Sequence, residues 1–422
     1  MKKIIVAHPG KQHSYKTAEA LYLNGNLFKY FTTVYDKQDW RLIFLRFFLP
    51  LNAKLKLYKR KSEILPDEKI ELRFVFLGFF LLFFYKLPIK KKYISFVYKI
   101  IHDAFGRSVA KYAIRNKVDA VIMFDTTANK CFQILKEKAP QIKRILDVSI
   151  ANRAFMKFNY EEDIKRTGDD RIKVEQSPLW DNVLLQRNDE EMALSQYFIV
   201  ASNMSKRSLT FSGIKENTIF RVPYGVDFNR FSFVEKKEPE APLNLIYVGE
   251  ISFRKGLHHL CKVVSEMNKE VQLKLVGFYN SNNIIYREFK YCPNIEFMGF
   301  VEHENLTNLY QSSDLFVFTT LGEGFGLVVL EALSCGLPCV VSNLAGGDDA
   351  IKNGENGFVF EAGNDDDLKK KIMWFVCNKD KIPEMSKKCN AMVKKYTWDN
   401  YYKNYNEIIN KIYSNEENII TD

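Results

Sequence analysis

The stretch that decides the fold is Thr319-Thr-Leu-Gly-Glu-Gly-Phe-Gly-Leu-Val-Val-Leu-Glu-Ala-Leu-Ser-Cys-Gly-Leu-Pro338. It predicts a glycine turn followed by a helix from Gly326 to Ser334, which a glycine and a proline then end. The apolar runs on either side, 314–319 and 339–342, predict buried strands. Two buried strands joined by a helix predict a parallel α/β sheet.

Two acids lie in this stretch, eight positions apart and in contrasting surroundings. Glu323 falls in the glycine turn, whereas Glu331 lies between Val328-Val-Leu330 and Ala332-Leu333. A carboxylate beside buried surface is costly unless it is paired, so Glu331 needs a partner. The vicinal hydroxyls of a ribose would suit it, because one carboxylate accepts a charge-assisted hydrogen bond from each. A neighbouring basic side chain is the alternative partner, in which case the glycines only make a turn.

The glycines of the turn favour a phosphate nearby. Residues without a Cβ let backbone N–H groups approach a ligand closely, and the helix N-terminus that follows attracts negative charge. A nucleotide would therefore suit both the turn and the buried acid.

The two acids and their spacing resemble the E-x7-E signature of glycosyltransferase family 4, which contains retaining enzymes of the GT-B fold that use nucleotide-activated sugars. The resemblance implies that Glu323 contacts hydroxyls of the donor sugar and that Glu331 holds the ribose of the nucleotide. It also implies that backbone amides near Gly324, Phe325 and Gly326 approach the sugar and the phosphates.

Two adjacent cations lie earlier in the same half of the chain. Leu245-Ile-Tyr-Val-Gly249 predicts a strand, and Arg254 and Lys255 follow it beside a glycine, where they would neutralise a diphosphate. The resemblance places diphosphate-binding Arg and Lys side chains here. Many family members have Arg directly after the strand glycine, whereas this chain has Glu250. Solvated surface is the alternative role for such a pair in a basic chain.

Further strands are predicted at 273–277 and 295–301, alternating with helices. Such alternation predicts a parallel sheet with ligands at the carboxyl ends of its strands. The resemblance implies that Val301 packs against the nucleotide base. The expected fold class is α/β of the GT-B type: two Rossmann-like domains with parallel sheets that face each other across a cleft, and a C-terminal helix that crosses back to the first domain.

A length of 422 residues exceeds one comfortable hydrophobic core. Prolines and charges at 223–242 predict a solvated hinge. We therefore expect an acceptor-side domain at 1–222, joined by the C-terminal helix at 398–422, and a donor-binding domain at 243–397.

The first domain opens with an apolar strand and the loop His8-Pro-Gly-Lys-Gln-His-Ser14. Gly10 and Lys11 lack the glycine spacing and the Lys-Ser/Thr pair of a Walker loop. The loop instead resembles the family's loop at the interdomain cleft, which implies that His8, Lys11 and His13 reach the acceptor or the donor phosphate. A structural role for the histidines is the alternative.

Two acids end further strands of this domain, Asp125 after 121–124 and Asp147 after 144–146. Many family members have a histidine near the reaction centre in this half, but Ile150 and Ala151 follow the second strand here. Asp125 and Asp147 are the remaining candidates. A retaining transfer needs no strong protein base, because the donor phosphate can itself help to deprotonate the incoming hydroxyl.

Positive charge is concentrated in the first domain. The chain has a net charge of +11, and residues 41–101 contain 14 Lys or Arg against 4 Asp or Glu. Aromatic residues lie among these cations, which suits binding of 40–101 to an anionic membrane surface. The apolar run 74–85 is too short to span a bilayer, which takes about twenty residues, and a buried helix is the alternative there. Nucleic acid is not expected, since no recognised binding module accompanies the charge.

The N-terminus and the cysteines favour a cytoplasmic protein. Met1-Lys-Lys3 leads straight into a core strand without an apolar leader, so we expect the cytoplasm or the inner face of the membrane. Seven cysteines without a Cys-x-x-Cys pair fit reduced thiols and give no zinc pattern. The acids Asp365-Asp-Asp367 are expected to cap a helix from Leu368 rather than to bind a metal. No cofactor and no metal are expected.

Three functions remain open on the sequence. The leading one is retaining transfer of a sugar from a nucleotide-activated donor, UDP- or GDP-linked, to a cell-envelope, polysaccharide or lipid-linked acceptor. The alternative is a non-catalytic GT-B partner subunit that binds nucleotide sugar or membrane, which the missing histidine favours and the two acids with their cations oppose. A nucleotide-sugar epimerase of the same fold fits less well, because its usual acid and histidine pattern is absent.

Overall fold

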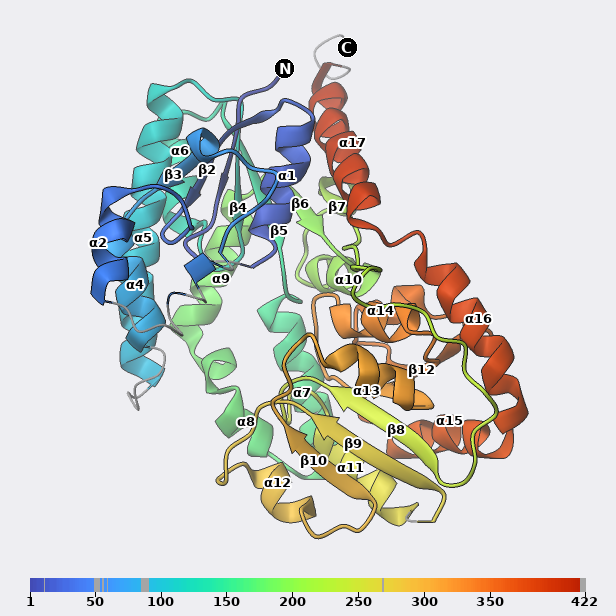
Figure 1. Ribbon diagram of the computed structural model, residues 1–422. Coiled ribbons are helices and arrows are strands. Elements are labelled where there is room, and N and C mark those ends of the chain that lie inside the picture. Colours follow the sequence, from blue (N-terminus) through green and yellow to red (C-terminus); the bar gives the residue numbers. More distant parts are fainter. Residues whose placement is uncertain are drawn as a thin grey trace.

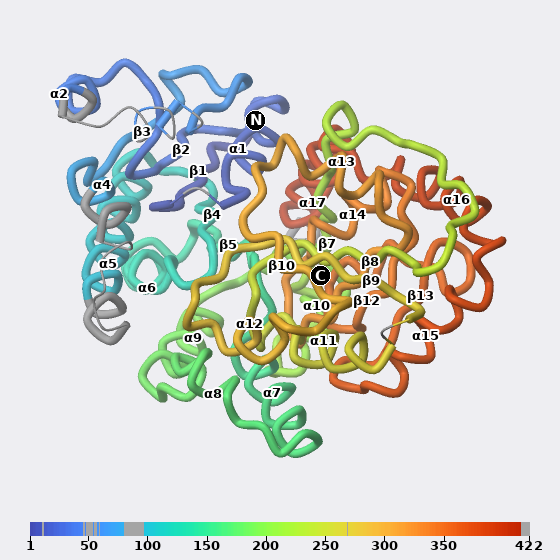
Figure 2. The backbone as a smooth tube through the Cα atoms, turned by 60° about the horizontal axis from the view of Figure 1, so that its bottom comes forward, coloured from blue at the N-terminus to red at the C-terminus, as the bar shows by residue number. Residues whose placement is uncertain are grey.

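The computed structural model describes residues 1–10, 12–48, 54, 57–58, 60–84, 91–267 and 269–417. Within these residues the strands form two sheets, and all neighbouring strands are parallel. The two sheets lie in separate lobes, the first in the blue-to-green part of the chain and the second in the yellow-to-orange part, whereas the red helix at the end of the chain lies on the first lobe (Figure 1). Figure 2 gives a second view of the same chain. The expected two-sheet architecture is therefore confirmed.

The first sheet has the order β3-β2-β1-β4-β5-β6-β7 among the described residues. Its strands are β1 (Ile4–Ala7), β2 (Leu27–Thr32), β3 (Ile70–Leu72), β4 (Ala120–Phe124), β5 (Lys143–Val148), β6 (Tyr197–Val200) and β7 (Ile219–Arg221). Strands β1 and β4 are buried along their whole length, as strands covered on both faces should be. The strand order reverses between β1 and β4, and that point of a parallel sheet is where ligands bind.

The second sheet has the order β10-β9-β8-β11-β12-β13 in the described part of the chain. Its strands are β8 (Leu243–Val248), β9 (Val271–Val276), β10 (Ile295–Gly299), β11 (Leu315–Phe318), β12 (Cys339–Ser342) and β13 (Gly357–Phe360). Here the order reverses between β8 and β11. The two strands that precede the Arg254-Lys255 pair and Glu323 are thus the two at the switch point.

Helices cover both sheets (Figure 1). In the first part of the chain they are α1 (Ser14–Leu23), α2 (Trp40–Phe48), α4 (Val75–Phe84), α5 (Lys91–Arg115), α6 (Asn129–Lys138), α7 (Arg153–Thr167), α8 (Arg171–Glu175), α9 (Asn182–Leu194) and α10 (Asn203–Phe211). The second part has α11 (Leu257–Glu266), α12 (Ile284–Phe289), α13 (Leu306–Ser312), α14 (Leu327–Ser334), α15 (Asp365–Cys377), α16 (Ile382–Val393) and α17 (Trp398–Glu417).

The helix after the glycine turn, α14, begins one residue later than expected. Gly326 precedes it with φ of +68°, a left-handed conformation that favours glycine. A Cβ at Gly326 would also lie 2.8 Å from the carbonyl oxygen of Ala345. The glycine is therefore required both for its backbone angle and for space.

The expectation that the acids 365–367 cap a helix from Leu368 is wrong in register. Helix α15 already begins at Asp365, and the cap is Asn364, whose side-chain oxygen accepts from the N–H of Asp367 at 3.1 Å. The acids lie in the first turn, where the helix dipole favours negative charge.

The last helix, α17, packs on α1 (Figure 1). Asn406 donates to the carbonyl of Ala20 at 2.8 Å, and the hydroxyls of Tyr401 and Thr17 are 3.0 Å apart. The end of the chain thus joins the element that carries the first loop after β1.

The basic segment 40–101 lies partly outside the described residues. Helix α2 exposes Trp40 (71%) and Phe47 (84%), whereas Val75 at the start of α4 is buried. Tyr85, the last residue of the apolar run 74–85, lies outside the described residues. No helix in the described part is long and apolar enough to span a membrane.

Candidate functional site

The loops at the switch point of the second sheet bring Arg254, Lys255 and Glu323 together. Lys255 Nζ contacts Glu323 Oε2 directly, and Arg254 Nη1 lies 3.6 Å from the same oxygen. Arg254 Nη2 lies 3.5 Å from Glu250 Oε2, so the acid that replaces the usual arginine pairs with the next cation. Two positive and two negative groups therefore meet where β8 and β11 end.

The charges of this cluster stabilise one another. Burial alone would raise the pKa of Glu323, but Lys255 and Arg254 outweigh it and hold the pKa below its ordinary value. Burial lowers the pKa of Lys255 despite the neighbouring Glu323, whereas the pKa of Arg254 is raised because Glu323 outweighs its burial. The cluster is thus poised to exchange an internal carboxylate for a bound anion such as a diphosphate.

Close backbone contacts fix the loop that carries the two cations. A Cβ at Gly256, whose φ is +65°, would lie 2.1 Å from the carbonyl oxygen of Thr319. Leu321 donates its N–H to the carbonyl of Arg254 at 3.0 Å, which ties this loop to the glycine turn. The cations are therefore held against Glu323 by the backbone and not only by charge.

Glu175, from the first part of the chain, also holds this loop. Its carboxylate accepts from the backbone N–H groups of Phe253 at 2.7 Å and Arg254 at 3.0 Å. The sequence had given no sign of this contact, because Glu175 lies about eighty positions earlier in α8. It positions the Arg254 backbone from the other domain.

Gly324 contacts the first domain instead of presenting an open edge. Its carbonyl oxygen accepts from the hydroxyls of Ser202 at 2.7 Å and Ser205 at 2.8 Å. A Cβ at Gly324 would lie 1.9 Å from the carbonyl oxygen of Ser149. The glycine turn is thus one of the places where the two domains are in direct contact. The next residue, Phe325, is buried against Tyr224 of the hinge, with ring centroids 5.2 Å apart.

Glu331 is buried, as the sequence predicts, and has two partners that the sequence did not reveal. Tyr310 donates its hydroxyl to Glu331 Oε2 at 3.1 Å, and His303 Nε2 lies 3.4 Å from Oε1. Arg230 Nη1 lies 2.8 Å from Nδ1 of His303, which holds the ring beside Glu331. The alternative of a neighbouring basic side chain is thus met by His303, and Tyr310 adds a hydroxyl.

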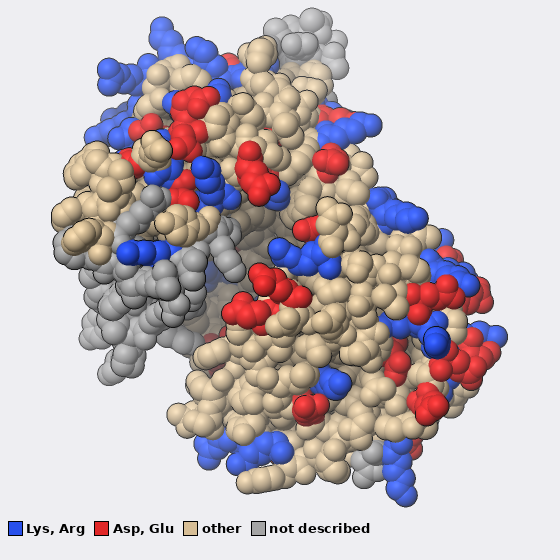
Figure 3. Space-filling view, viewed as in Figure 1, with Lys and Arg blue, Asp and Glu red and all other residues tan. Residues whose placement is uncertain are grey.

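Glu331 lies at the edge of a pocket of about 600 Å³ between the domains. Lys16 of α1 and Trp398 of α17 line the pocket together with Arg230 and His303. On the face shown in Figure 3 the surface is hollowed between the upper and lower lobes. A ligand that touches Glu331 would thus also touch the first domain.

Val301, the expected base contact, lies just past the end of β10 and is half-buried in the core. Its neighbour Phe300 is 68% exposed. Both residues come shortly before His303 in the chain, and His303 lines the Glu331 pocket. The loop after β10 therefore leads into this pocket.

The histidines of the first loop are held in place by protein contacts. His8 is buried, and its Nδ1 accepts from the N–H of Gly10 at 2.9 Å. Burial lowers the pKa of His8 to about 3, so the ring is neutral. His13 Nε2 lies 2.9 Å from Asp147 Oδ1, and the hydroxyl of Tyr224 is 3.1 Å from its Nδ1. Lys11 lies outside the described residues.

The two acids of the first domain differ in their surroundings. Asp125 accepts from the N–H and the hydroxyl of Ser149 at 2.8 and 2.6 Å, and burial raises its pKa. Asp147 accepts from the hydroxyls of Thr17 and Tyr405, both at 3.2 Å, besides contacting His13. Asp147 thus joins β5 to α1 and α17, whereas Asp125 lies beside the strand end that faces Gly324.

A second pocket, of about 620 Å³, opens at the carboxyl edge of the first sheet. Lys99, Arg153 and Arg187 line it, and so does Thr126 directly after β4. Thr126 has φ of +71°, a strained conformation for a β-branched residue that occurs where function or packing requires it. The sequence gives no sign of this pocket, because its cations come from three separated elements.

Two all-parallel sheets, each with its switch point at the space between the domains, define the GT-B architecture. Residues 228–396, which contain the whole second sheet, match the family model described as Glycosyl transferases group 1. This part of the chain is therefore similar to a group 1 glycosyltransferase domain.

Two relatives and one solved structure show the extent of the similarity. The chain is 32% identical over 164 residues to "Sulfoquinovosyl transferase SQD2" of Arabidopsis thaliana, covering 38% of this chain and 32% of that protein. It is 29% identical over 191 residues to "Capsular polysaccharide biosynthesis glycosyltransferase CapM" of Staphylococcus aureus, covering 41% and 50%. The chain thus aligns with a third to a half of the length of these relatives.

The similarity in fold extends over the whole chain. A sucrose-phosphate synthase structure from Thermosynechococcus elongatus superposes with a TM-score of 0.68 and 16% identity, covering 98% of this chain and all of that one. At this level of identity the likeness concerns the fold alone.

Proposed function

We propose that the protein is a retaining glycosyltransferase that moves a sugar from a nucleotide-activated donor to a cell-envelope, polysaccharide or lipid-linked acceptor. The observation that carries the proposal is the meeting of Arg254, Lys255 and Glu323 at the switch point of the group 1 domain. Glu331 lies eight residues further on in the interdomain pocket.

In the proposed reaction the donor diphosphate takes the place of Glu323 on Lys255 and Arg254. The displaced carboxylate is then free to accept hydrogen bonds from hydroxyls of the donor sugar. As the bond from the anomeric carbon to the diphosphate breaks, the two cations stabilise the charge that develops on the leaving group, an effect of the kind that often amounts to about 3 kcal/mol. The acceptor oxygen then bonds to the anomeric carbon on the face that the diphosphate leaves, and its proton passes to a diphosphate oxygen. No metal or cofactor is proposed for this step.

Glu331 is proposed to hold the ribose through its two carboxylate oxygens. Tyr310 and His303 already contact one oxygen each, so the carboxylate is oriented before the nucleotide arrives. Val301 and its neighbours would then lie next to the nucleotide base. This division leaves Glu323 for the sugar.

The acceptor is proposed to enter over the pocket at the edge of the first sheet. Lys99 and Arg153 suit an acceptor with negative charge, such as a lipid-linked diphosphate. The exposed aromatic side chains of α2 and the basic segment 40–101 would hold the enzyme at an anionic membrane surface on the cytoplasmic side.

The proposal is tested by incubating the purified protein with UDP-, GDP- and ADP-sugars and a membrane lipid extract. The expected result is transfer with retention of the anomeric configuration, and loss of transfer in Glu323→Gln. Glu355→Gln, which lies in an exposed turn beside Lys352, is the matched control and should keep full activity.

Two outcomes would replace the proposal. Binding of a nucleotide sugar without turnover on any acceptor fraction would favour the non-catalytic partner subunit. Inversion of the anomeric centre would exclude the retaining mechanism. Flotation with anionic vesicles tests the membrane contact separately. If the protein stays in the unbound fraction, the membrane contact is excluded.

A further inference from the structure

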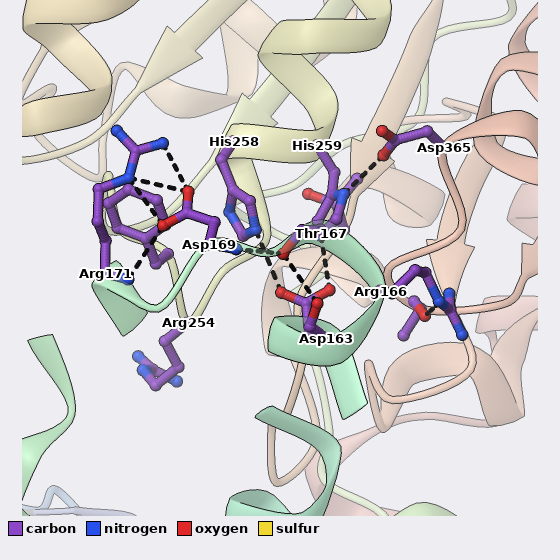
Figure 4. Close-up of polar contacts among 12 residues, drawn as sticks. Asp163, Arg166, Thr167, Asp169, Arg171, Arg254, His258, His259 and Asp365 are labelled. Carbon is purple, nitrogen blue, oxygen red and sulfur yellow. Dashed lines mark hydrogen bonds and ion pairs between the residues drawn. The ribbon is translucent and has the colours of Figure 1, made fainter. Parts of the chain in front are cut away.

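Two adjacent histidines at the start of α11 face one carboxylate across the domain boundary. His258 Nε2 lies 3.3 Å from Asp163 Oδ2, and His259 Nε2 lies 2.9 Å from Asp163 Oδ1. Asp163 belongs to α7, whereas the histidines follow the donor loop of the second domain directly. In Figure 4 both rings point toward Asp163, while Arg254 lies apart from the cluster. The proposed transfer reaction uses none of these three residues.

We propose that Asp163, His258 and His259 bind a divalent transition metal, with Zn²⁺ as the best-suited ion, and that the metal links the two domains. Two imidazole nitrogens and one carboxylate oxygen form a donor set typical of zinc sites with three protein ligands and a water in the fourth position. One ligand atom from each residue lies within 4.8 Å of the others.

The separations already approach those of a tetrahedral site. Metal–ligand bonds of 2.0–2.2 Å at tetrahedral angles place neighbouring ligand atoms about 3.3 Å apart. The two nitrogen–oxygen distances, 3.3 Å to Asp163 Oδ2 and 2.9 Å to Asp163 Oδ1, are close to this value, but each nitrogen faces a different oxygen. Small side-chain rotations that turn one Asp163 oxygen toward both imidazole nitrogens would complete the site.

The residues around the site orient its ligands. Asp365 Oδ1 lies 2.6 Å from Nδ1 of His259, so it holds a proton on that nitrogen and leaves Nε2, which faces Asp163, as the nitrogen that would bind the metal. Lys262 Nζ holds the other oxygen of Asp365 at 2.8 Å. A carboxylate behind a metal-binding histidine is a common supporting contact. Nδ1 of His258 has no hydrogen-bond partner among the described residues. The imidazole can therefore carry its proton on Nδ1 when Nε2 binds a metal.

The site is accessible and is not blocked by the cations nearby. A pocket of about 480 Å³ reaches both histidines, which leaves room for the ion and a water ligand. Arg171 in its wall pairs with Asp169 at 2.6 Å and with Glu288 at 3.0 Å. Arg166 pairs with Glu361 at 2.9 Å. These positive charges are thus compensated by their own acids.

A proton is the competitor for this site. His259 already contacts both carboxylates through its two ring nitrogens. A metal binds only an unprotonated imidazole nitrogen, so metal binding should tighten as the pH rises.

The test is a titration of the chelator-treated full-length protein with Co²⁺ and Zn²⁺. We expect one ion per chain, the absorption bands of tetrahedral Co²⁺, and release of protons on binding. His258→Gln and Asp163→Asn should abolish the bands, and Asp365→Asn should weaken binding roughly 10- to 100-fold. His102→Gln removes a histidine in the pocket at the edge of the first sheet and should leave metal binding unchanged.

The controls separate this site from the donor site. His258→Gln leaves the contacts of His259 with both carboxylates intact, so it should fold even if Asp163→Asn does not, and circular dichroism verifies this. No bound ion in the wild type, or equal affinity in His258→Gln, would overturn the proposal. Nucleotide binding should survive chelation, so failure of the metal site would leave the proposed transfer untouched.

Discussion

At the scale of single residues, the donor site depends on a buried ion pair. Lys255 and Glu323 are 11% and 19% exposed at their side chains, and Arg254 lies beyond the pair. Removing one partner of a buried pair leaves an uncompensated charge, which typically costs about 3–5 kcal/mol. The pair is therefore important for stability before any donor binds.

Lys255→Met should lower the free energy of unfolding by about 3 kcal/mol, because it leaves Glu323 with only the more distant Arg254. The loss should be smaller when Glu323→Gln is present as well, since the unpaired charge is then gone. Urea unfolding of the four proteins in this cycle measures the coupling. Equal losses with and without Glu323 would show that the two side chains do not interact.

A half-buried acid at the domain boundary, Asp348, should make stability depend on pH. Burial and the neighbouring Asp349 raise the pKa of Asp348 to about 7. Because its folded pKa exceeds the unfolded value of about 3.9, the folded state keeps a proton that the unfolded state has lost, and stability falls as the pH rises between these values.

Asp348→Asn should remove this decline. The variant should gain stability over the wild type by up to about 4 kcal/mol at pH 8, and the gain should shrink toward pH 5. Urea unfolding at both pH values measures it, with the exposed Asp366→Asn as control. A constant difference at both pH values would contradict the assignment.

The sequence predicts single residues well where one element decides their surroundings. Glu331 could be placed against buried surface because its neighbours in the same helix are apolar. Its partners Tyr310 and His303 could not, since they come from another helix and another loop. Glu175 and the pair His258 and His259 were missed for the same reason: their contacts form only when the two domains meet.

At the scale of elements, a lysine of the hinge caps the C-terminus of helix α13. Lys236 is buried and donates to the carbonyl oxygens of Tyr310, Gln311 and Ser313 at 2.9, 2.6 and 2.7 Å. Unpaired carbonyls at a helix C-terminus need such a donor, and positive charge also suits the helix dipole. The hinge thus stabilises α13, the helix whose Tyr310 contacts Glu331. The composition of the hinge had predicted only a solvated linker.

Lys236→Met should lower the free energy of unfolding by roughly 2 kcal/mol or more, because it leaves buried carbonyl groups without a donor. Nucleotide affinity should fall with it, since Tyr310 lies in the same helix. Lys237→Met changes an exposed neighbour and should stay within about 0.5 kcal/mol of the wild type. If both variants were equally stable, the lysine would have no capping role.

Elements were predicted from the sequence more reliably than their contacts. Apolar runs and glycines located the strands around Glu323 to within one or two residues, because burial and backbone angle act locally. The contacts of α7 and α8 with the second domain were not predicted. No residue pattern in these helices indicates which surface they cover.

At the scale of the whole molecule, the glycine turn joins the donor site to the domain interface. Gly324 touches Ser149 and accepts from two serines of the first domain, while Glu323 beside it holds the cations. Opening of the domains would therefore disturb the turn that the donor is proposed to approach.

Gly324→Ala should force the domains apart, because the new Cβ would lie 1.9 Å from the backbone oxygen of Ser149. We expect a larger radius of gyration by small-angle scattering and faster proteolysis in the hinge. Gly322→Ala is the matched control, since the nearest atoms to its Cβ would be side-chain atoms, Met156 Cγ at 3.3 Å and the Tyr160 hydroxyl at 3.5 Å. An unchanged radius and cleavage rate in Gly324→Ala would mean that the contact does not hold the domains together.

The most direct test of the account is calorimetric titration of the wild type, Glu331→Gln and Glu355→Gln with UDP, GDP and ADP. We expect one of the three nucleotides to bind the wild type, about tenfold or more weaker binding to Glu331→Gln through loss of charge-assisted hydrogen bonds to the ribose, and unchanged binding to Glu355→Gln. Wild-type affinity in Glu331→Gln would contradict the ribose role, and binding of none of the nucleotides to the wild type would contradict the donor site itself.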